Sequence, residues 1–347
     1  MKKLKSLVFF FVNLMFCLSI LFFGLQRASA KELNIYSYRS PALLEPFTKQ
    51  YEKEFNVKFN ILHAKKGLAQ RLKLEGKNSP ADIILTVDIS RLSELADMDL
   101  VKQIDSKIIN NNVPKHLRDI NKKWVSLSTR ARIIGVSNKR VNKNEILNIE
   151  DLADPKYKGK ICTRIGSHPY NRALLASIVA HSGESKATAW VEGLVSNFAR
   201  KPKGNDRAQI LAVAAGEADL AVANSYYIAL MLSGKKGPEQ QAAAKKVRPV
   251  FPNQSNRGTH MNISGGGVAK YAPNKENAIK FLEFLLTKEA QEHIVNNSFE
   301  YPMIAGVEPN KLIAQFGTSF KQDNKTKVTT YYSNQKKALT LMKKAGW

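Results

Sequence analysis

The chain after residue 30 alternates between short apolar runs and amphipathic segments. Each apolar run is rich in Ile, Leu and Val, which is typical of a buried strand. Between the runs, apolar residues recur at helical spacing. This order of strand and helix predicts an open, mostly parallel sheet. The predicted strands are Leu33–Tyr36, Val57–Leu62 and Ala81–Thr86, and the predicted helices are Leu43–Phe55, Leu68–Glu75 and Asp88–Met98.

The same alternation starts again in the middle of the chain. Ile149–Ala153 and Lys160–Thr163 begin this second α/β unit, and Ala218–Ala223 is a further strand of small apolar residues. From Lys275 onward the pattern is mainly helical. The helices predicted for the second unit lie near Pro169–His181, Lys186–Phe198 and Ala208–Gly216.

Two extended stretches, Trp124–Ser137 and His260–Ala269, are long enough to pass from one lobe to another. The second stretch contains Gly265-Gly266-Gly267, which would permit hinge flexing or a close approach of the lobes. We therefore predict an α/β protein of two lobes that are joined by two crossing strands, with a ligand in the cleft between them. Residues 31–130 and 261–304 would form the N-terminal lobe, and residues 131–260 and 305–347 the C-terminal lobe.

The first thirty residues predict export. Lys2, Lys3 and Lys5 precede the apolar run Leu7–Leu25, and small residues end at Ala30. This is the arrangement of a secretory signal peptide, residues 1–30, with cleavage expected after Ala30. An uncleaved membrane anchor is the alternative, because the apolar run is somewhat long. The location expected for the mature chain is a bacterial periplasm.

Composition narrows the function. The formal charge is +25, but the basic residues are spread along the chain without a basic-aromatic cluster, so we interpret them as solvated surface and predict no nucleic-acid partner. Cys162 is the one cysteine left after cleavage, which excludes an intramolecular disulfide and a cysteine metal cluster. No Gly-rich phosphate loop, nucleophile elbow or His-Glu-x-x-His helix occurs, so we do not expect an enzyme.

Tyr226 and Tyr227 are the most informative residues. They follow the strand Ala218–Ala223, and Asn224 or Ser225 is a natural N-cap, so both phenols fall in a first helical turn. A helix N-terminus and a bound cation each favour the phenolate. Two phenolates at a cleft are hard oxygen ligands for a hard cation such as Fe³⁺. The alternative is a half-buried core pair with each hydroxyl outward.

A series of short motifs runs along nearly the whole mature chain, each weak alone but informative in this order. The motifs are Asn34–Arg39, Asn78–Ile83, Thr86–Asp88, Thr129–Arg132, Tyr170-Asn171, Asn224–Tyr227, Arg257–His260 and Asn262–Gly265. Through them the chain resembles the periplasmic ferric-ion-binding proteins of ABC iron importers. The resemblance implies the type II two-lobed solute-binding fold, Fe³⁺ held by the paired tyrosines, delivery to an ABC-type iron permease in the inner membrane, and a monomer. In one branch of the family a third tyrosine also binds the iron, and Tyr170 matches its position.

Tyr170 also suits the chemistry, because it follows Pro169 at a predicted helix start that Ser167 could cap. The first lobe departs from the family pattern. Ser40-Pro41 stands where many members place a histidine, and Val87 where some place a glutamate. Tyr38 could substitute as a ligand, but it lies two residues early and is the weaker candidate.

An incomplete ligand set predicts a bound anion, which the resemblance suggests is carbonate or a similar small anion. Arg39 and Arg130 are the candidates that hold it, because an arginine fork matches a planar oxyanion. The alternatives are a surface role for Arg39 and an interlobe salt bridge for Arg130. We expect His168 and His260 to cap or orient backbone rather than to bind iron. The alternative function is a solute-binding protein for another anion or a metal chelate.

Overall fold

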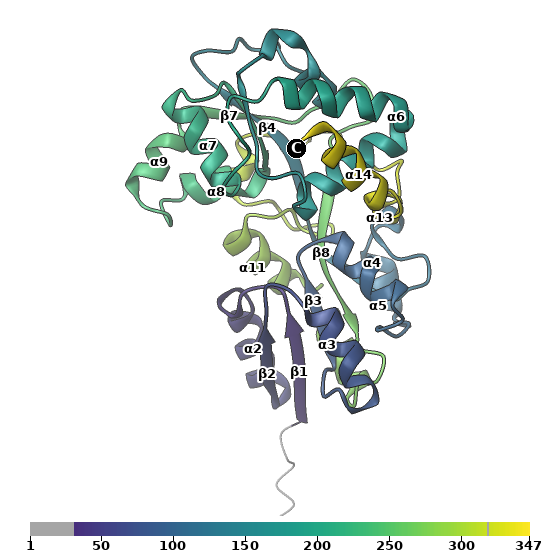
Figure 1. The fold of residues 1–347 in the computed structure, drawn as a ribbon. Helices are drawn as coiled ribbons and strands as arrows, with labels where there is room; N and C mark the ends of the chain where they lie inside the picture. The colour runs from purple at the N-terminus through teal and green to yellow at the C-terminus, as the bar shows by residue number, and fades with distance from the viewer. Residues whose placement is uncertain (1–30, 318) are drawn as a thin grey trace, which may run out of the picture.

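Two α/β lobes are joined by β4 (Val125–Ser137) and β8 (Met261–Val268), which run from one lobe into the other (Figure 1). The structure is a computed structural model that describes residues 31–317 and 319–347. The predicted signal peptide, residues 1–30, lies outside the described residues. The prediction of two lobes with two crossing strands is confirmed.

The first lobe is built on the sheet order β2-β1-β3-β8-β4. The first three strands are parallel to one another, and β8 runs antiparallel to both neighbours. All four residues of β3 are buried, as expected for a central strand covered on both faces. The predicted elements are confirmed to within about two residues. The elements are β1 (Lys31–Ser37), β2 (Val57–His63), β3 (Ile83–Thr86), α2 (Pro41–Phe55), α3 (Leu68–Glu75), α4 (Ile89–Asp97), α5 (Lys107–Asn112), α10 (Lys275–Phe284) and α11 (Lys288–Ser298), with short 3₁₀ helices at Gly76–Asn78 and Lys115–Leu117.

The second lobe continues from the far half of β4, which pairs with two further strands. Its longest helix, α6 (Pro169–Ser196), is interrupted at Gly183, where φ is 79° and ψ is 171°. The two helices predicted for this region are therefore correct in type, with the break at this glycine. The other elements are β5 (Ile161–Cys162), β6 (Leu220–Asn224), β7 (Val247–Val250), α7 (Asp206–Ala215), α8 (Ser225–Leu232), α9 (Pro238–Ala244), α12 (Lys311–Ala314), α13 (Val328–Ser333) and α14 (Gln335–Ala345), with 3₁₀ helices at Ile149–Ala153 and Pro155–Tyr157.

The glycine triplet lies where β8 is paired on both sides. A Cβ at Gly265 would clash with the backbone carbonyl of Val125, and one at Gly266 would lie 2.7 Å from the Leu85 side chain. The prediction that the triplet allows a close approach of the two lobes is wrong. The glycines instead allow neighbouring strands of the first lobe to approach closely.

Separate apolar cores fill the two lobes, one in the first and one on each face of the second lobe's sheet. Helix α14 packs against α6, whereas α13 contacts both α4 and α6. Tyr331 of α13 joins the first-lobe core, and Phe299 joins a second-lobe core. The residue bounds of the lobes remain a proposal, because elements near those bounds contact both sides.

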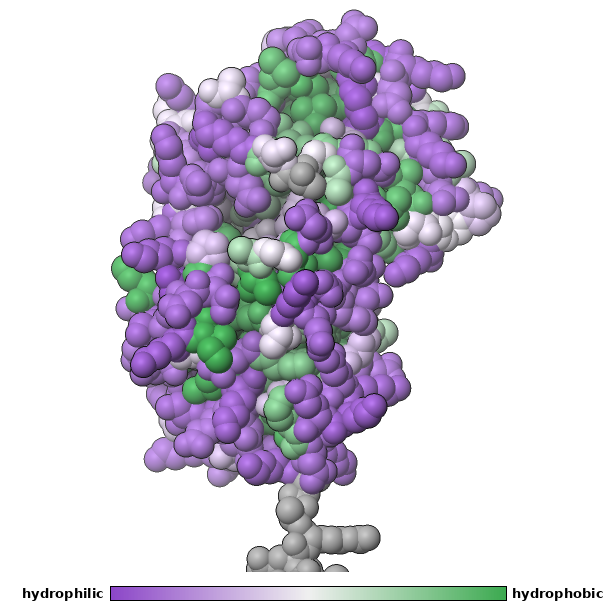
Figure 2. Space-filling view, turned by 180° about the vertical axis from the view of Figure 1, so that it is seen from behind, coloured by the Kyte–Doolittle hydropathy of each residue, from purple (hydrophilic) through white to green (hydrophobic). Residues whose placement is uncertain are grey.

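The surface seen from behind is mostly hydrophilic, with apolar side chains in scattered patches (Figure 2). Within residues 31–317 and 319–347, no helix combines the length and the apolar character needed to cross a membrane.

Candidate metal site

The three predicted tyrosines lie together. The hydroxyl oxygens of Tyr170 and Tyr226 are 3.4 Å apart, and the rings of Tyr226 and Tyr227 have centroids 4.2 Å apart. Tyr170 is the second residue of α6, and the pair occupies the second and third positions of α8. All three therefore come from first helical turns, as the sequence predicted, and all three are half-buried.

The start of α6 is capped by a histidine. His168, not Ser167, is the N-cap, and its Nδ1 accepts a hydrogen bond from the Tyr170 backbone N–H at 3.3 Å. Burial, with Arg164 nearby, lowers the pKa of His168 to about 3, so its ring is neutral and able to accept. The predicted cap at Ser167 is wrong, and the predicted capping role of His168 is confirmed.

His260 does not behave in this way. Its ring is buried beside Tyr331, with centroids 4.7 Å apart, and neither ring nitrogen has a hydrogen-bond partner among the described residues. Burial lowers its pKa to about 3, which keeps it neutral. The prediction that this side chain caps or orients backbone is therefore wrong.

Burial keeps the paired phenols protonated while no metal is bound. It raises the pKa of Tyr226 well above the ordinary value of 10.0, and the neighbouring Tyr170 and Tyr227 add to the shift. It raises the pKa of Tyr227 to about 12, again with a contribution from Tyr170. The helix N-terminus, which favours the phenolate, is thus outweighed until a cation arrives.

Three guanidinium groups surround the Tyr170 ring. The central carbons of Arg130, Arg132 and Arg164 lie 5.2, 5.9 and 5.4 Å from its centroid. Asp206, which is fully buried, binds Arg132 at 2.6 Å and Arg164 at 3.1 Å. Burial would raise the pKa of Asp206, but the two arginines outweigh it and lower that pKa. Asp206 therefore carries the charge that holds both cations in place.

Asp206 also fixes the strand end that leads to the paired tyrosines. Its Oδ2 accepts a hydrogen bond from the Asn224 backbone N–H at 2.8 Å. The Asn224 side chain makes no capping hydrogen bond, and its Oδ1 accepts from Arg132 instead, at 3.1 Å. The local geometry of Tyr226 and Tyr227 thus depends on a buried ion network behind them.

Arg39 and Arg130, the predicted anion-binding pair, meet at Glu300. Arg39 donates to a Glu300 oxygen at 2.8 Å, and Arg130 lies 3.8 Å from the other oxygen. Arg130 also lies 3.7 Å from Asp88 and donates to the Val87 carbonyl. The side chain of Arg39 is only 11% exposed, so it is not the surface residue that was considered as an alternative.

Tyr38 has another partner. Its hydroxyl accepts hydrogen bonds from the backbone N–H groups of Leu68 at 3.1 Å and Ala69 at 3.3 Å, which caps the N-terminus of α3. The guanidinium of Arg91 covers its ring at 3.9 Å. Both interactions hold the phenol oxygen at the end of α3, where it is already bonded and is not a free metal ligand.

A cavity of about 500 Å³ lies between the lobes. Tyr170 and Tyr226 face it from the second lobe, and Tyr38, Arg39 and Val87 from the first. Within the part of the chain that the structure describes, the cleft included, no group of three or more His, Cys, Asp or Glu side chains could hold a metal ion. Clustered phenols are therefore the donor set that this cleft offers to a hard cation.

Two lobes around one cleft at the crossing strands define a solute-binding protein. Residues 78–331 match the model of the family described as Bacterial extracellular solute-binding protein. Over 318 residues the chain is 43% identical to iron uptake protein A1 of Synechocystis sp., covering 91% of this chain and 88% of that protein. The chain belongs to the family of bacterial extracellular solute-binding proteins.

Solved structures agree. A Trichodesmium protein (IdiA, FutA) in complex with iron and citrate ligands is 45% identical, with a TM-score of 0.87 over 91% of this chain and 99% of that one. The ferric iron-binding protein A of Mannheimia haemolytica in an open conformation is 44% identical, with a TM-score of 0.85 over 91% and 99%. These findings confirm the predicted resemblance and the type II fold. Proteins of this family transport a solute, and the chain is not an enzyme, as predicted.

Several residues of the site were not predicted. Arg132 was noted only as part of a marker, although it lies two residues from Arg130 on the same strand and so on the same face. Alternation along that strand could have identified it. Asp206 and Glu300 gave no such signal, because single acidic residues near helix ends are ordinary and their partners are distant in the sequence.

Proposed function

We propose that this protein captures Fe³⁺ in the periplasm through Tyr170, Tyr226 and Tyr227. After removal of residues 1–30 it acts as a monomer and delivers iron to an ABC-type permease in the inner membrane. The names of the relatives, an iron uptake protein and ferric iron-binding proteins, support this role. The observation that carries the proposal is the clustering of three phenols beside one cleft. Tyr170 and Tyr226 line the cleft with their hydroxyls 3.4 Å apart, and the Tyr227 ring packs against that of Tyr226.

The charge balance of the site favours an accompanying anion. Three phenolates neutralise one Fe³⁺ ion. Around them stand four guanidinium groups and three carboxylates, which leaves one positive charge. This positive charge would attract carbonate or a similar small anion, and Arg39 and Arg130 could hold it by releasing part of their contact with Glu300. The seven groups are Arg39, Arg130, Arg132, Arg164, Asp88, Asp206 and Glu300.

The size of the cleft supports a second possibility. A cavity of about 500 Å³ is large for one ion and one small anion, and the exposed Lys235 and Lys236 also line it. An anionic iron chelate would fit this space and charge. The alternative proposal is therefore a solute-binding protein that takes iron as a chelate, with the tyrosines replacing some of the chelator's oxygens.

Ferric titration of the purified protein tests the proposal. A visible band from phenolate-to-iron charge transfer should appear and saturate at one equivalent, and citrate should remove the metal only slowly. Tyr170→Phe, Tyr226→Phe and Tyr227→Phe should each weaken iron retention and shift the band while keeping the ring packing. Tyr271→Phe is the matched control, because Tyr271 is exposed and lies outside the cleft lining. Wild-type colour and retention in all three site variants would refute the tyrosine site.

The first-lobe ligand is tested in the same series. Tyr38→Phe removes the oxygen that caps α3, so a small loss of stability is expected with the visible band unchanged. A band shift as large as that of the site variants would make Tyr38 a ligand instead.

A further inference from the structure

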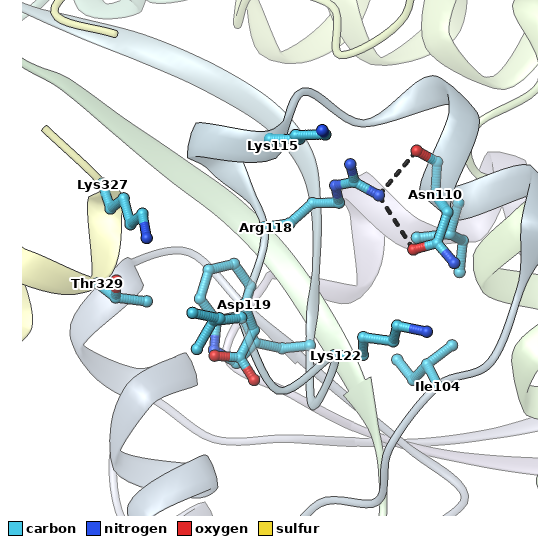
Figure 3. Close-up of a pocket in the computed structure, with 11 residues that line it drawn as sticks. Ile104, Asn110, Lys115, Arg118, Asp119, Lys122, Lys327 and Thr329 are labelled. Carbon is cyan, nitrogen blue, oxygen red and sulfur yellow. Dashed lines mark hydrogen bonds between the residues drawn. The ribbon is translucent and has the colours of Figure 1, made fainter. Parts of the chain in front are cut away.

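A second cavity, of about 330 Å³, lies outside the cleft. Residues between Ile104 and Trp124 form most of its wall, and Lys327 and Thr329 at the start of α13 close it (Figure 3). Its volume is at the lower end of the range of small-molecule sites. It therefore has room for one small organic molecule.

The cavity combines an apolar floor with a basic rim. Buried Ile104, Ile109 and Trp124 supply the floor. Four cations and one carboxylate line the same space, and Figure 3 shows them gathered around it. The net charge of the lining is therefore three positive charges. The five charged residues are Lys115, Arg118, Lys122, Lys327 and Asp119.

Few acidic side chains neutralise these positive charges. Lys122 lies 3.7 Å from Asp105, whose side chain is 91% exposed, so this ion pair is weak. Lys115 and Lys327 form no ion pair with the described residues. The Asp119 carboxylate accepts a hydrogen bond from the backbone N–H of Lys123 at 2.8 Å.

Arg118 is held in position for a ligand. Its Nη1 donates to the backbone oxygen of Asn110 at 2.7 Å and to the side-chain oxygen at 3.0 Å. These bonds fix the guanidinium plane, and its Nη2 donates to none of the described residues. A fixed guanidinium with free donors binds a carboxylate at a lower entropic cost than a mobile lysine does.

We propose that this cavity binds a small polycarboxylate with a flat apolar body. Two or three carboxylates would pair with Arg118 and the lysines, and the body would lie against Trp124 and the isoleucines. Inorganic phosphate matches the charge but leaves the apolar floor uncovered, so it should bind more weakly. The inference is independent of the proposed iron site.

Iron-free protein and benzene-1,3,5-tricarboxylate test the inference by calorimetry and tryptophan fluorescence. We expect saturable one-to-one binding that quenches Trp124 and weakens as salt is added. The Lys115→Gln, Lys327→Gln double variant should lose about tenfold in affinity, because it removes two of the four cations that line the cavity. Both lysines are exposed, so the fold should be unaffected, and retained ferric binding checks this.

Two controls locate the site. The Lys158→Gln, Lys203→Gln double variant makes the same change in charge at exposed lysines of the second lobe and should bind the tricarboxylate as the wild type does. Arg39→Ala, in the cleft, should also leave this binding unchanged. Equal weakening in both lysine double variants would show nonspecific attraction and overturn the proposal. Loss of binding in Arg39→Ala, or equal affinity for phosphate, would overturn it as well.

Discussion

Iron capture by protonated phenols releases protons, and their number sets how steeply the affinity depends on pH. Tyr226 has a pKa well above 10.0 and Tyr227 one of about 12, so both are neutral at pH 7 without metal. Each phenol that becomes a ligand gives up one proton. Each proton released changes the apparent affinity about tenfold per pH unit, or about 1.4 kcal/mol.

Three phenolic ligands therefore predict a loss of about 1,000-fold, or about 4 kcal/mol, for each unit by which the pH falls. The affinity falls as the pH falls because protons and Fe³⁺ compete for the same oxygens. Bicarbonate that binds as carbonate adds one further proton. In its presence the slope of log affinity against pH should rise from about three to about four.

Competition with nitrilotriacetate between about pH 6 and pH 8 measures the slope, after correction for chelator protonation and ferric hydrolysis. Tyr227→Phe should lower the slope by one, whereas Tyr271→Phe should not change it. A wild-type slope of one or less would refute capture by three protonated phenols. A loss confined to the region near pH 6.5 would indicate histidine ligands instead. An unchanged slope in Tyr227→Phe would remove this residue from the ligand set.

Three further predictions follow from the packing. Asp206→Asn should lower the free energy of unfolding, measured with urea, by about 3–5 kcal/mol, because it leaves two buried arginines without their charged partner. Asp105→Asn, at an exposed ion pair, should lower it by about 0–1 kcal/mol. Equal effects of the two variants would contradict the buried network. Gly265→Ala should destabilise by about 1–3 kcal/mol or more through its clash with a neighbouring strand, and unchanged urea unfolding would contradict that geometry. Iron loading should close the two lobes and so reduce the radius of gyration in small-angle scattering. The Arg39→Ala, Arg130→Ala double variant should keep the visible iron band but lose this closure. Closure as complete as in the wild type would argue against an anion bridge.

Most of the fold could be predicted because the local patterns agree with the packing. The run from Leu220 to Ala223 is apolar on both faces, and all four of its residues are buried in the structure. Polar Asn224 and Ser225 end that strand and start α8, which places Tyr226 in a first turn. The alternation of strand and helix then favours parallel pairing, and the long uninterrupted run of β4 allows it to serve both lobes.

The site could be predicted only in part, because its charges meet across long distances in the sequence. Arg39 and Glu300 are 261 residues apart, and Arg132 and Asp206 are 74 apart. A single sequence shows that each of these residues is charged, but not which opposite charge it meets. The three tyrosines could be predicted from the sequence, because two are adjacent and the third follows a proline at a helix start. Ser167 was predicted as the N-cap of α6 in place of His168 because serine has the stronger general preference for that position.

The chemistry of the proposed ligands explains how the three phenols can lie close together when no metal is bound. Three carboxylates at this spacing would be ionised at neutral pH and would repel one another. Phenols stay neutral there, and burial raises the pKa of Tyr226 and Tyr227 further, so their close contact costs no charge repulsion. Only a cation that interacts strongly enough with oxygen to displace these protons can occupy the site. A divalent ion gains less electrostatic energy from each phenolate than Fe³⁺ does and must displace the same protons. The proton affinity of the buried phenols therefore acts as the threshold that favours ferric iron.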